Sequence, residues 1–385
     1  MPLPSLMILD GELRNVMGAV RSLGHLGIPL MVGSSRPFGR SCFSKYVTNR
    51  FKYPPLESPI EVLHEAIIDR VRAWQPGVLL PVSPKVWSII YAYFDEYEQL
   101  TRVVPCPDEQ LFKGVSDKGR AAEYAELYRV PIPKTFRPKS QEEVIELCDK
   151  LPYPVLLKPR ESFAGIGIRK VNRADELSEA ICKFRDVPII QEFIEGEDLE
   201  LTILCFHGKS LAGSAYKSLH NAPLPYGPPV ACKTIRNDVL MRMGIEFLEK
   251  LKYHGVAHLD FRVDNKDGQA KLIDFNPRLA GTNDISIRSG VDFVYMLYNL
   301  ALGEKVEPCF NYEIGIEFRW LIEWWHLMKT KINYRTVLDL LRWRRVATEI
   351  SITDPMPHII IFYDVLQRVL KRLKSQNTEI VLSAE

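Results

Sequence analysis

The feature that most constrains the fold of this 385-residue chain is a pair of short segments at residues 255–264 and 271–278. Each mixes apolar and polar residues, and a polar turn separates them, which predicts two adjacent strands. Because strand side chains alternate between faces, Asp274 and Asn276 point the same way, and Asp260 can face them from the neighbouring strand.

The two carboxylates and the amide oxygen of these residues favour a Mg²⁺ site. Mg²⁺ is usually held by one or two carboxylates together with substrate phosphates. Arg278 adds a forked donor for phosphate or carboxylate. A solvent-facing hairpin is the alternative, since Asp and Asn are common near turns. The apolar neighbours Leu272, Ile273 and Phe275 favour a packed strand, where an unpaired carboxylate is costly.

Composition excludes several classes of protein. A hydrophobic content of 46% and a charged content of 25% are ordinary for a globular chain with two or three domains. The net charge of +2 gives no general attraction to nucleic acid, so no nucleic-acid partner is expected. Seven scattered cysteines without a CxxC pair argue against a disulfide framework or structural zinc and predict a cytoplasmic location. Neither a signal peptide nor a membrane-spanning stretch is recognisable.

The chain opens with a strand–helix–strand pattern. Strands are predicted at residues 5–9 and 28–32 around a helix at 15–26, and a further buried strand is predicted at 77–82. This order predicts a parallel α/β unit. The order is Rossmann-like, but no GxGxxG follows the first strand, so we do not expect a dinucleotide site.

A second unit is predicted to begin near residue 115. Ser116 or Asp117 can cap its first helix, and the Pro-containing residues 130–133 end that helix. The predicted helices are residues 118–128, 142–151, 239–251 and 294–302, and the predicted strands are residues 154–158, 168–171, 189–193 and 199–206.

Two further segments of this unit carry chemistry. Lys158 precedes a small-residue loop with Gly165 and Gly167, where backbone N–H groups can approach and cradle phosphate oxygens. Alone, this loop is explained equally by a plain hairpin. After residue 191 the predicted strand reaches a turn with a glycine, and the residues that follow the turn are acidic. The backbone of this segment can pair with an adenine edge, and Asp198 or Glu200 can accept hydrogen bonds from ribose hydroxyls. An exposed acidic loop is the alternative.

In this order, Lys118, the Lys158 glycine loop, the hinge at 191–198 and the strand at 274–278 resemble the ATP-grasp superfamily. The resemblance covers roughly residues 1–305. The last strand and the residues that follow it most resemble the carbamoyl-phosphate-synthase-like and amino-acid-ligase branches of that superfamily.

The resemblance implies an α/β (α+β) ATP-grasp fold. Its parts would be an N-terminal Rossmann-like pre-ATP-grasp domain at residues 1–115 and a nucleotide-binding domain at 116–305. The nucleotide-binding domain would divide into a small lid at about 119–190 and a larger antiparallel-sheet subdomain. A helical C-terminal extension would occupy residues 306–385.

The resemblance also implies residue roles. The implied ATP contacts are Lys118, Lys158, Ser162, Gly165, Gly167, Gln191, Glu192, Phe193, Ile194 and Asp198. The implied ligands of one or two Mg²⁺ ions, with Mn²⁺ as the alternative metal, are Asp260, Asp274 and Asn276. The implied catalytic residues are Lys158, Lys217 and Arg278, and the implied substrate contacts are Lys233 and Arg288.

Three departures from the family pattern stand out. The metal carboxylates are Asp where Glu is commoner, and the hinge begins with Gln191 in place of Glu. His258 lies where some relatives carry an activating Arg. Lys217 and Lys233 can supply the missing charge or lie on a solvated face, and Arg288 can pair with a substrate carboxylate or be structural.

The implied activity is an ATP-dependent ligase that joins a small-molecule carboxylate to an amine through an acyl phosphate. Two alternatives stay open. One is a regulatory protein that binds nucleotide without ligase activity, and the other is an ATP-grasp enzyme with a thiol acceptor or a carboxylation outcome.

The tail after residue 306 is rich in tryptophan and basic residues, and an amphipathic helix is predicted at about 362–374. Two arrangements are open for the tail. It can contact anionic lipid or a lipid-linked substrate as an interfacial helix. Alternatively, its aromatic side chains pack on the preceding domain or on a second subunit of a homodimer, and its basic side chains stay solvated.

Overall fold

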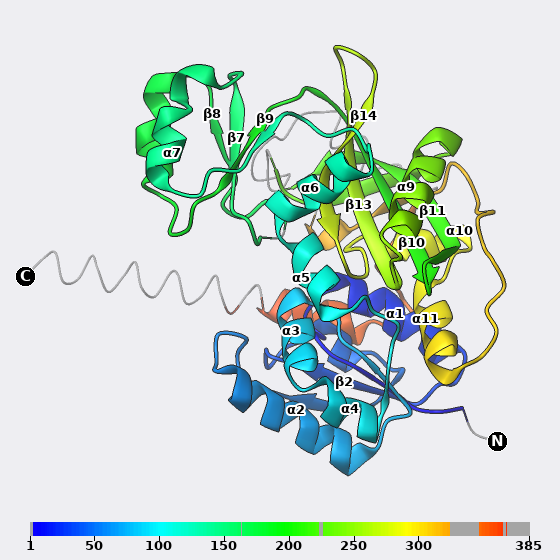
Figure 1. Cartoon of the computed structure of the whole chain (residues 1–385). Coiled ribbons are helices and arrows are strands. Elements are labelled where there is room, and N and C mark those ends of the chain that lie inside the picture. The colour runs from blue at the N-terminus through cyan, green and yellow to red at the C-terminus, as the bar shows by residue number, and fades with distance from the viewer. Residues whose placement is uncertain (1–2, 163, 223–225, 324–345, 365–366, 368–385) are drawn as a thin grey trace, which may run out of the picture. The chain divides into compact units, whose positions relative to one another are not determined.

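The computed structural model describes residues 3–162, 164–222, 226–323, 346–364 and 367 (Figure 1). The chain divides into two compact units. The first unit contains residues 1–104 with the described part of 350–385, and the second contains residues 105–349.

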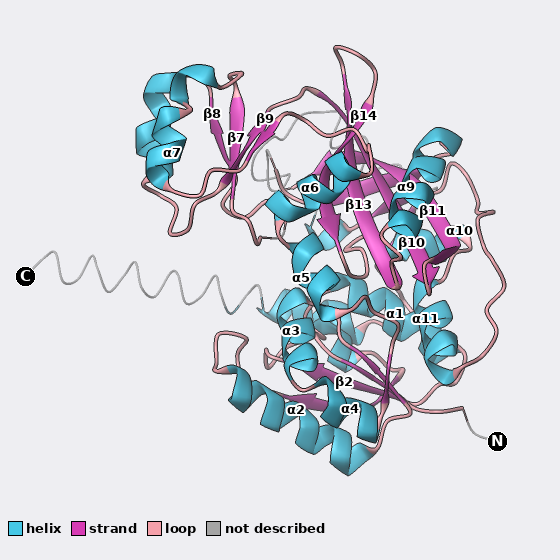
Figure 2. Cartoon of the chain, viewed as in Figure 1, coloured by secondary structure: helices cyan, strands magenta, loops and turns pink. Residues whose placement is uncertain are grey.

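The first unit is built on a five-stranded parallel sheet with the order β3-β2-β1-β4-β5, and Figure 2 shows helices alongside these strands. The strands are β1 (Leu6–Ile8), β2 (Leu30–Ser34), β3 (Val47–Lys52), β4 (Val78–Leu80) and β5 (Arg102–Val103). The helices are α1 (Arg14–His25), α2 (Ile60–Trp74), α3 (Pro84–Ala92) and α4 (Phe94–Leu100), with a 3₁₀ turn at Arg40–Phe43. The predicted parallel α/β opening is confirmed, because the short apolar strands β1, β2 and β4 are buried along their whole length, as strands covered on both faces are.

The second unit contains a seven-stranded and a four-stranded sheet. The larger sheet has the order β14-β13-β10-β11-β12-β15-β16 and is antiparallel except between β15 and β16. Its strands are β10 (Gly196–Phe206), β11 (Lys209–Asn221), β12 (Pro229–Thr234), β13 (Gly255–Asp264), β14 (Ala270–Asn276), β15 (Glu317–Arg319) and β16 (Ala347–Thr348). The smaller, antiparallel sheet has the order β6-β9-β7-β8, with β6 (Thr135–Phe136), β7 (Val155–Lys158), β8 (Arg169–Val171) and β9 (Ile189–Glu192).

Among its described residues, the second unit contains the four helices that the sequence pattern predicts and three further helices that it does not. They are α5 (Glu109–Ser116), α6 (Lys118–Leu127), α7 (Gln141–Glu146), α8 (Leu177–Ile181), α9 (Asp238–Lys250), α10 (Asn283–Ser289) and α11 (Phe293–Leu302), with 3₁₀ turns at Cys148–Lys150 and Ala174–Glu176. Asp117 caps α6, as expected, by accepting from the backbone N–H groups of Gly119 and Arg120. The helix predicted at 142–151 is shorter, because α7 ends at Glu146 and a 3₁₀ turn follows. Figure 1 shows α7 beside β7 and β8, where Val144 packs in the core of the smaller sheet.

The larger sheet has one apolar and one polar face. Leu199 and Leu201 of β10 and Leu259 of β13 pack with Phe247 of α9 in a buried core. The residues that alternate with them on β10, β13 and β14 are largely polar and face the other way. This polar face carries the candidate site.

The tail is only partly described. β15 and β16 add to the edge of the larger sheet, Trp320 is fully buried, and a helix covers residues 356–364. Most of the predicted helix at 362–374 and most of the tryptophan-rich and basic residues lie outside the described residues. No helix in the described ranges is long and apolar enough to cross a bilayer.

Candidate active site

The register of three strands brings the predicted metal ligands together. Asp260 of β13 lies opposite Asp274 of β14, and His258 lies opposite Asn276. On the other side of β13, Asp260 lies opposite Glu200 of β10. All five side chains therefore share the polar face of the sheet.

Asp260 is held on both sides of its carboxylate. The Asn276 Nδ2 donates to Asp260 Oδ2 at 3.1 Å, and Arg278 Nη2 donates to Asn276 Oδ1 at 3.0 Å. His258 Nε2 lies 3.0 Å from Asp260 Oδ1. Burial raises the pKa of Asp260, but the charge and hydrogen bond of His258, together with the charges of Arg278 and Lys118, outweigh burial and hold the pKa below its usual value.

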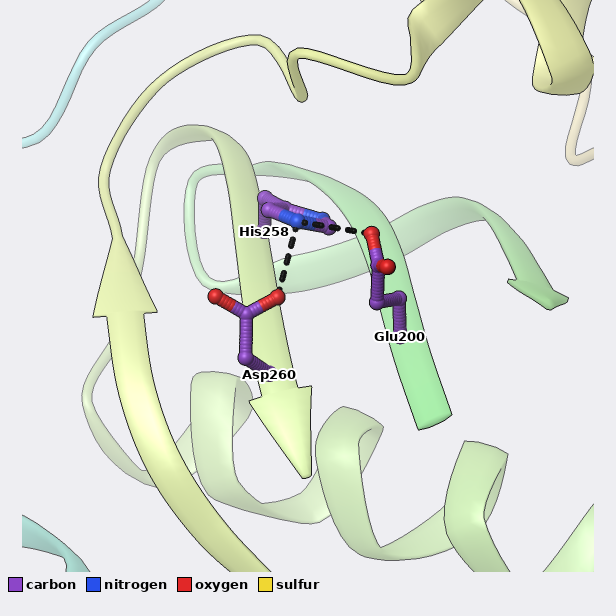
Figure 3. Close-up of side chains that lie close together, drawn as sticks. All are labelled: Glu200, His258 and Asp260. Carbon is purple, nitrogen blue, oxygen red and sulfur yellow. Dashed lines mark ion pairs between the residues drawn. The ribbon is translucent and has the colours of Figure 1, made fainter. Parts of the chain in front are cut away.

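His258 lies between two carboxylates (Figure 3). Its Nε2 is 3.3 Å from Glu200 Oε2, and its Nδ1 is 3.2 Å from the hydroxyl of Thr202. Burial would lower the pKa of this imidazole, yet Asp260 and Glu200 together raise it to about 9. The prediction counted only oxygen ligands at this site, and the structure adds a histidine nitrogen that reaches two carboxylates of the same sheet face.

Two lysines approach Asp274 from other elements. Lys118, the first residue of α6, donates to Asp274 Oδ1 at 2.8 Å and to the carbonyl of Ser162 at 3.0 Å. Lys158, at the end of β7, donates to Gln191 Oε1 at 2.6 Å and to the carbonyl of Ile273 at 3.2 Å. Burial lowers the pKa of Lys158 to about 8. These two ammonium groups are placed to meet an anion beside the carboxylate cluster.

The glycine loop after Lys158 has the backbone that a close approach requires. Ala164, Gly165 and Gly167 have φ values of 55°, 73° and 80°, in the left-handed region. The buried hydroxyl of Ser162 has no hydrogen-bond partner in the described part of the chain. A Cβ on Gly165 would lie 1.9 Å from the carbonyl oxygen of Tyr226, so only glycine fits there.

We expect Gly165→Ala to weaken ATP binding by about tenfold or more, because the loop must shift away from Tyr226 and small misplacements are costly. Gly268→Ala is the matched control, since Gly268 has a φ of 69° but open space around its Cα. Calorimetric titration of both variants with ATP measures the effect. Equal affinities in the two variants would contradict it.

The hinge residues are already engaged within the protein. Gln191 Nε2 donates to Thr135 at 3.0 Å, and the backbone N–H groups of Glu192 and Phe193 donate to the carbonyls of Lys134 and Pro154. A contact from Glu192 to an adenine edge would therefore use its carbonyl.

Two more of the expected hinge contacts are occupied by protein groups. The Ile194 carbonyl lies 3.5 Å from Arg262 Nη1, and Asp198 accepts from Arg262 Nε at 2.6 Å and from Asn221 at 3.1 Å. Ribose hydroxyls would compete with these donors for Asp198.

Three expected residues are not brought to the cluster. Lys217 lies opposite Leu199, on the core face of the sheet, and pairs with Glu197 at 2.7 Å. Lys233 lies opposite Lys217 and faces the same way. Arg288 is exposed near the end of α10, and among the described residues no hydrogen bond joins it to the cluster. Strand alternation thus removes both lysines from the polar face.

Sequence reasoning missed the role of Glu200 and Thr202 as partners of His258. Glu200 is 3% exposed and also accepts from Thr282 at 3.3 Å. An available signal was the alternation of polar Asp198, Glu200 and Thr202 with apolar residues along β10, which places all three on one face.

The residues present fit a nucleotide with a divalent cation. Asp260, Asp274 and Asn276 offer hard oxygen donors, and Lys118, Lys158 and Arg278 offer fixed positive charge beside them.

Comparisons with known proteins agree with this geometry. Residues 115–282 match the family model described as ATP-grasp domain. A carbamoyl phosphate synthase large chain of Archaeoglobus fulgidus is 23% identical over 214 residues, which cover 52% of this chain and 19% of that protein. A D-aspartate ligase of Enterococcus faecium is 26% identical over 205 residues, which cover 47% of this chain and 49% of that protein. The chain thus matches at most about half the length of these relatives.

A solved structure shares the fold. The biotin carboxylase domain of Hydrogenobacter thermophilus 2-oxoglutarate carboxylase, a dimer in complex with MgADP, ADP and bicarbonate, superposes with a TM-score of 0.64 at 16% identity. The superposition covers 82% of this chain and 74% of that one. The expected ATP-grasp fold is confirmed.

Proposed function

We propose that this chain, whose residues 115–282 form an ATP-grasp domain, ligates a small-molecule carboxylate to an amine in a reaction driven by ATP. The observation that carries the proposal is the meeting of Asp260, Asp274 and Asn276 on one sheet face with Lys118 and Arg278. The similarity to a D-aspartate ligase supports an amide-forming outcome.

Each part of the cluster has a task in phosphoryl transfer, which needs mainly positioning and charge neutralisation. Lys118 and Lys158 would bind phosphate oxygens, with Lys118 leaving Asp274 as the nucleotide enters. Asp260, Asp274 and Asn276 would hold one or two Mg²⁺ ions. The bound metal would neutralise charge on the phosphates.

The reaction then runs in two steps. A carboxylate oxygen of the substrate attacks the γ-phosphorus, the bond to ADP breaks, and an acyl phosphate forms. Arg278, held by Asn276, would stabilise the transferred phosphoryl group. The amine nitrogen attacks the acyl carbon, phosphate leaves, and the nitrogen loses its proton to give the amide.

The glycine loop would exclude water during these steps, because an exposed acyl phosphate hydrolyses. Lys118 already contacts the Ser162 carbonyl at the start of this loop, so a phosphate bound by Lys118 lies next to it. The buried, unpartnered hydroxyl of Ser162 offers a further donor.

Carboxylation is the second candidate outcome, favoured by the structural similarity to a biotin carboxylase domain that holds bicarbonate. Both outcomes share the phosphorylation of a carboxylate-like oxygen. They differ in whether bicarbonate or an organic acid stimulates ADP release.

The test is a screen for ADP release with Mg²⁺ across amino acids, other small carboxylic acids, amines and bicarbonate, followed by mass spectrometry of the product. We expect one acid–amine pair to stimulate ADP release in proportion to amide formed. Stimulation by bicarbonate alone would favour carboxylation. ATP binding without ADP release across the whole panel would contradict both and favour a regulatory nucleotide-binding protein.

A further inference from the structure

Three side chains that can ligate a metal converge on one point of the polar sheet face. Glu200, His258 and Asp260 each offer one ligand atom, and these atoms all lie within 4.8 Å of one another. Figure 3 shows the imidazole between the two carboxylates, which come from the neighbouring strands β10 and β13. The hard-oxygen site described above uses only Asp260 of these three.

The imidazole is oriented by a group outside the three. Its Nδ1 lies 3.2 Å from the hydroxyl of Thr202, which leaves Nε2 directed at the carboxylates. Histidines that ligate metals commonly have the second ring nitrogen held in this way. With His258 5% exposed, water has little access to Nε2.

The two carboxylates are also held from outside. Asn276 donates to Asp260 Oδ2 and leaves Oδ1 facing His258, while Thr282 donates to Glu200. The separations of 3.0 and 3.3 Å between Nε2 and the two oxygens are close to the spacing of about 3 Å expected for neighbouring ligands of one ion with bonds near 2.1 Å.

We propose that Glu200, His258 and Asp260 bind one divalent cation through one nitrogen and two carboxylates, with the cation replacing the Nε2 proton, which is released to solvent, so that the site prefers Mn²⁺ to Mg²⁺. Imidazole is a good ligand for transition metals, whereas Mg²⁺ favours oxygen ligands and retains water. The inference rests on the proposed function in one respect, because Asp260 would then be shared between this ion and the nucleotide-bound metal.

The first experiment is a spin-echo measurement on the full wild-type chain loaded with one equivalent of Mn²⁺ and without nucleotide. Modulation from a directly bound imidazole nitrogen is expected. Its absence would overturn the proposal and would leave the three residues as an ion-paired triad only. This measurement needs no variant, so it stands even if a substitution impairs folding.

The second experiment compares affinities for Mn²⁺ and Mg²⁺ by titration of the metal-free chain. Wild type is expected to bind Mn²⁺ at least about tenfold more tightly than Mg²⁺. His258→Gln should weaken Mn²⁺ binding by about tenfold or more and change Mg²⁺ binding less. His25→Gln, at an exposed position in the other unit, is the control and should match wild type. Equal Mn²⁺ affinity in His258→Gln and wild type would overturn the proposal.

These measurements separate the metal inference from the ligase proposal, since neither nucleotide nor substrate is present. Nitrogen coupling together with a screen that finds no ADP release would retain the metal site and contradict the ligase. Substrate-stimulated ADP release without nitrogen coupling would retain the ligase proposal and contradict the metal site.

Discussion

Asp274→Asn is expected to slow substrate-stimulated ADP release by about a thousand-fold or more, because metal-assisted charge stabilisation is worth several kcal/mol. Asp274 lies opposite Asp260 and accepts from Lys118, so it joins the metal ligands to a phosphate-binding lysine. Asparagine keeps the shape and can still accept from Lys118 while removing the negative charge. The fold should persist, and thermal unfolding should show a similar midpoint.

Asp267→Asn is the matched control for this variant. Asp267 belongs to the same hairpin, but its side chain is 48% exposed in the turn and pairs with Lys271 at 3.0 Å. We expect its ADP release to equal that of wild type. Turnover by Asp274→Asn within about twofold of this control would rule out Asp274 as a metal ligand in the reaction.

Lys158→Met is expected to abolish ATP binding while the fold becomes no less stable. Lys158 is 5% exposed, and burial of a charge is costly enough that an apolar replacement of similar length is often neutral or stabilising. Its two acceptors, Gln191 and the Ile273 carbonyl, lose a donor, which offsets part of the gain. The rise in unfolding temperature on adding Mg-ATP should disappear in this variant.

Lys183→Met is the control, because Lys183 is exposed and pairs only with Glu179 of the neighbouring helical turn among the described residues. It should keep the ATP-dependent rise in unfolding temperature. A normal rise in Lys158→Met would contradict the role of Lys158 in phosphate binding.

The lowered pKa of Lys158 also predicts a pH dependence of stability. Below about pH 8 the amine is protonated in both the folded and the unfolded state, so the cost of burying the charge is constant. Between about 8 and the ordinary value of 10.5, the unfolded chain binds more protons, and this group makes the free energy of unfolding rise with pH. Denaturant unfolding should show that the free energy of unfolding of wild type rises with pH relative to that of Lys158→Met between about pH 8 and 10.5. A pH-independent difference would contradict the shift.

Local sequence was sufficient for the features that depend on neighbouring residues. Alternation along β14 placed Asp274 and Asn276 on one face, and the single polar turn placed Asp260 across from them. Asp117 capped α6 where its side chain could reach the first free N–H groups. These predictions involve short-range geometry, which a strand or a helix imposes without reference to the remainder of the chain.

The same local rules could not place residues whose partners are distant along the chain. Lys118 reaches Asp274 across 156 positions, and Arg262 occupies Asp198 across 64. Lys217 was expected at the site for its charge, but the pairing of β10 with β11 aligns it with Leu199 on the core face. A register shifted by one residue would have reversed that orientation.

The sequence by itself determined the strand pair with two carboxylates and an amide, the glycine loop and the order of motifs that indicates an ATP-grasp domain. Only the tertiary structure decided that β10 lies beside β13 in a register that sets Glu200 across from Asp260, with His258 between the two carboxylates. The physical reason is that pairing between strands far apart in sequence depends on the packing of the whole sheet. The periodicity of a strand determines on which face of the sheet each side chain lies, whereas the pairing of strands determines which residues lie beside it.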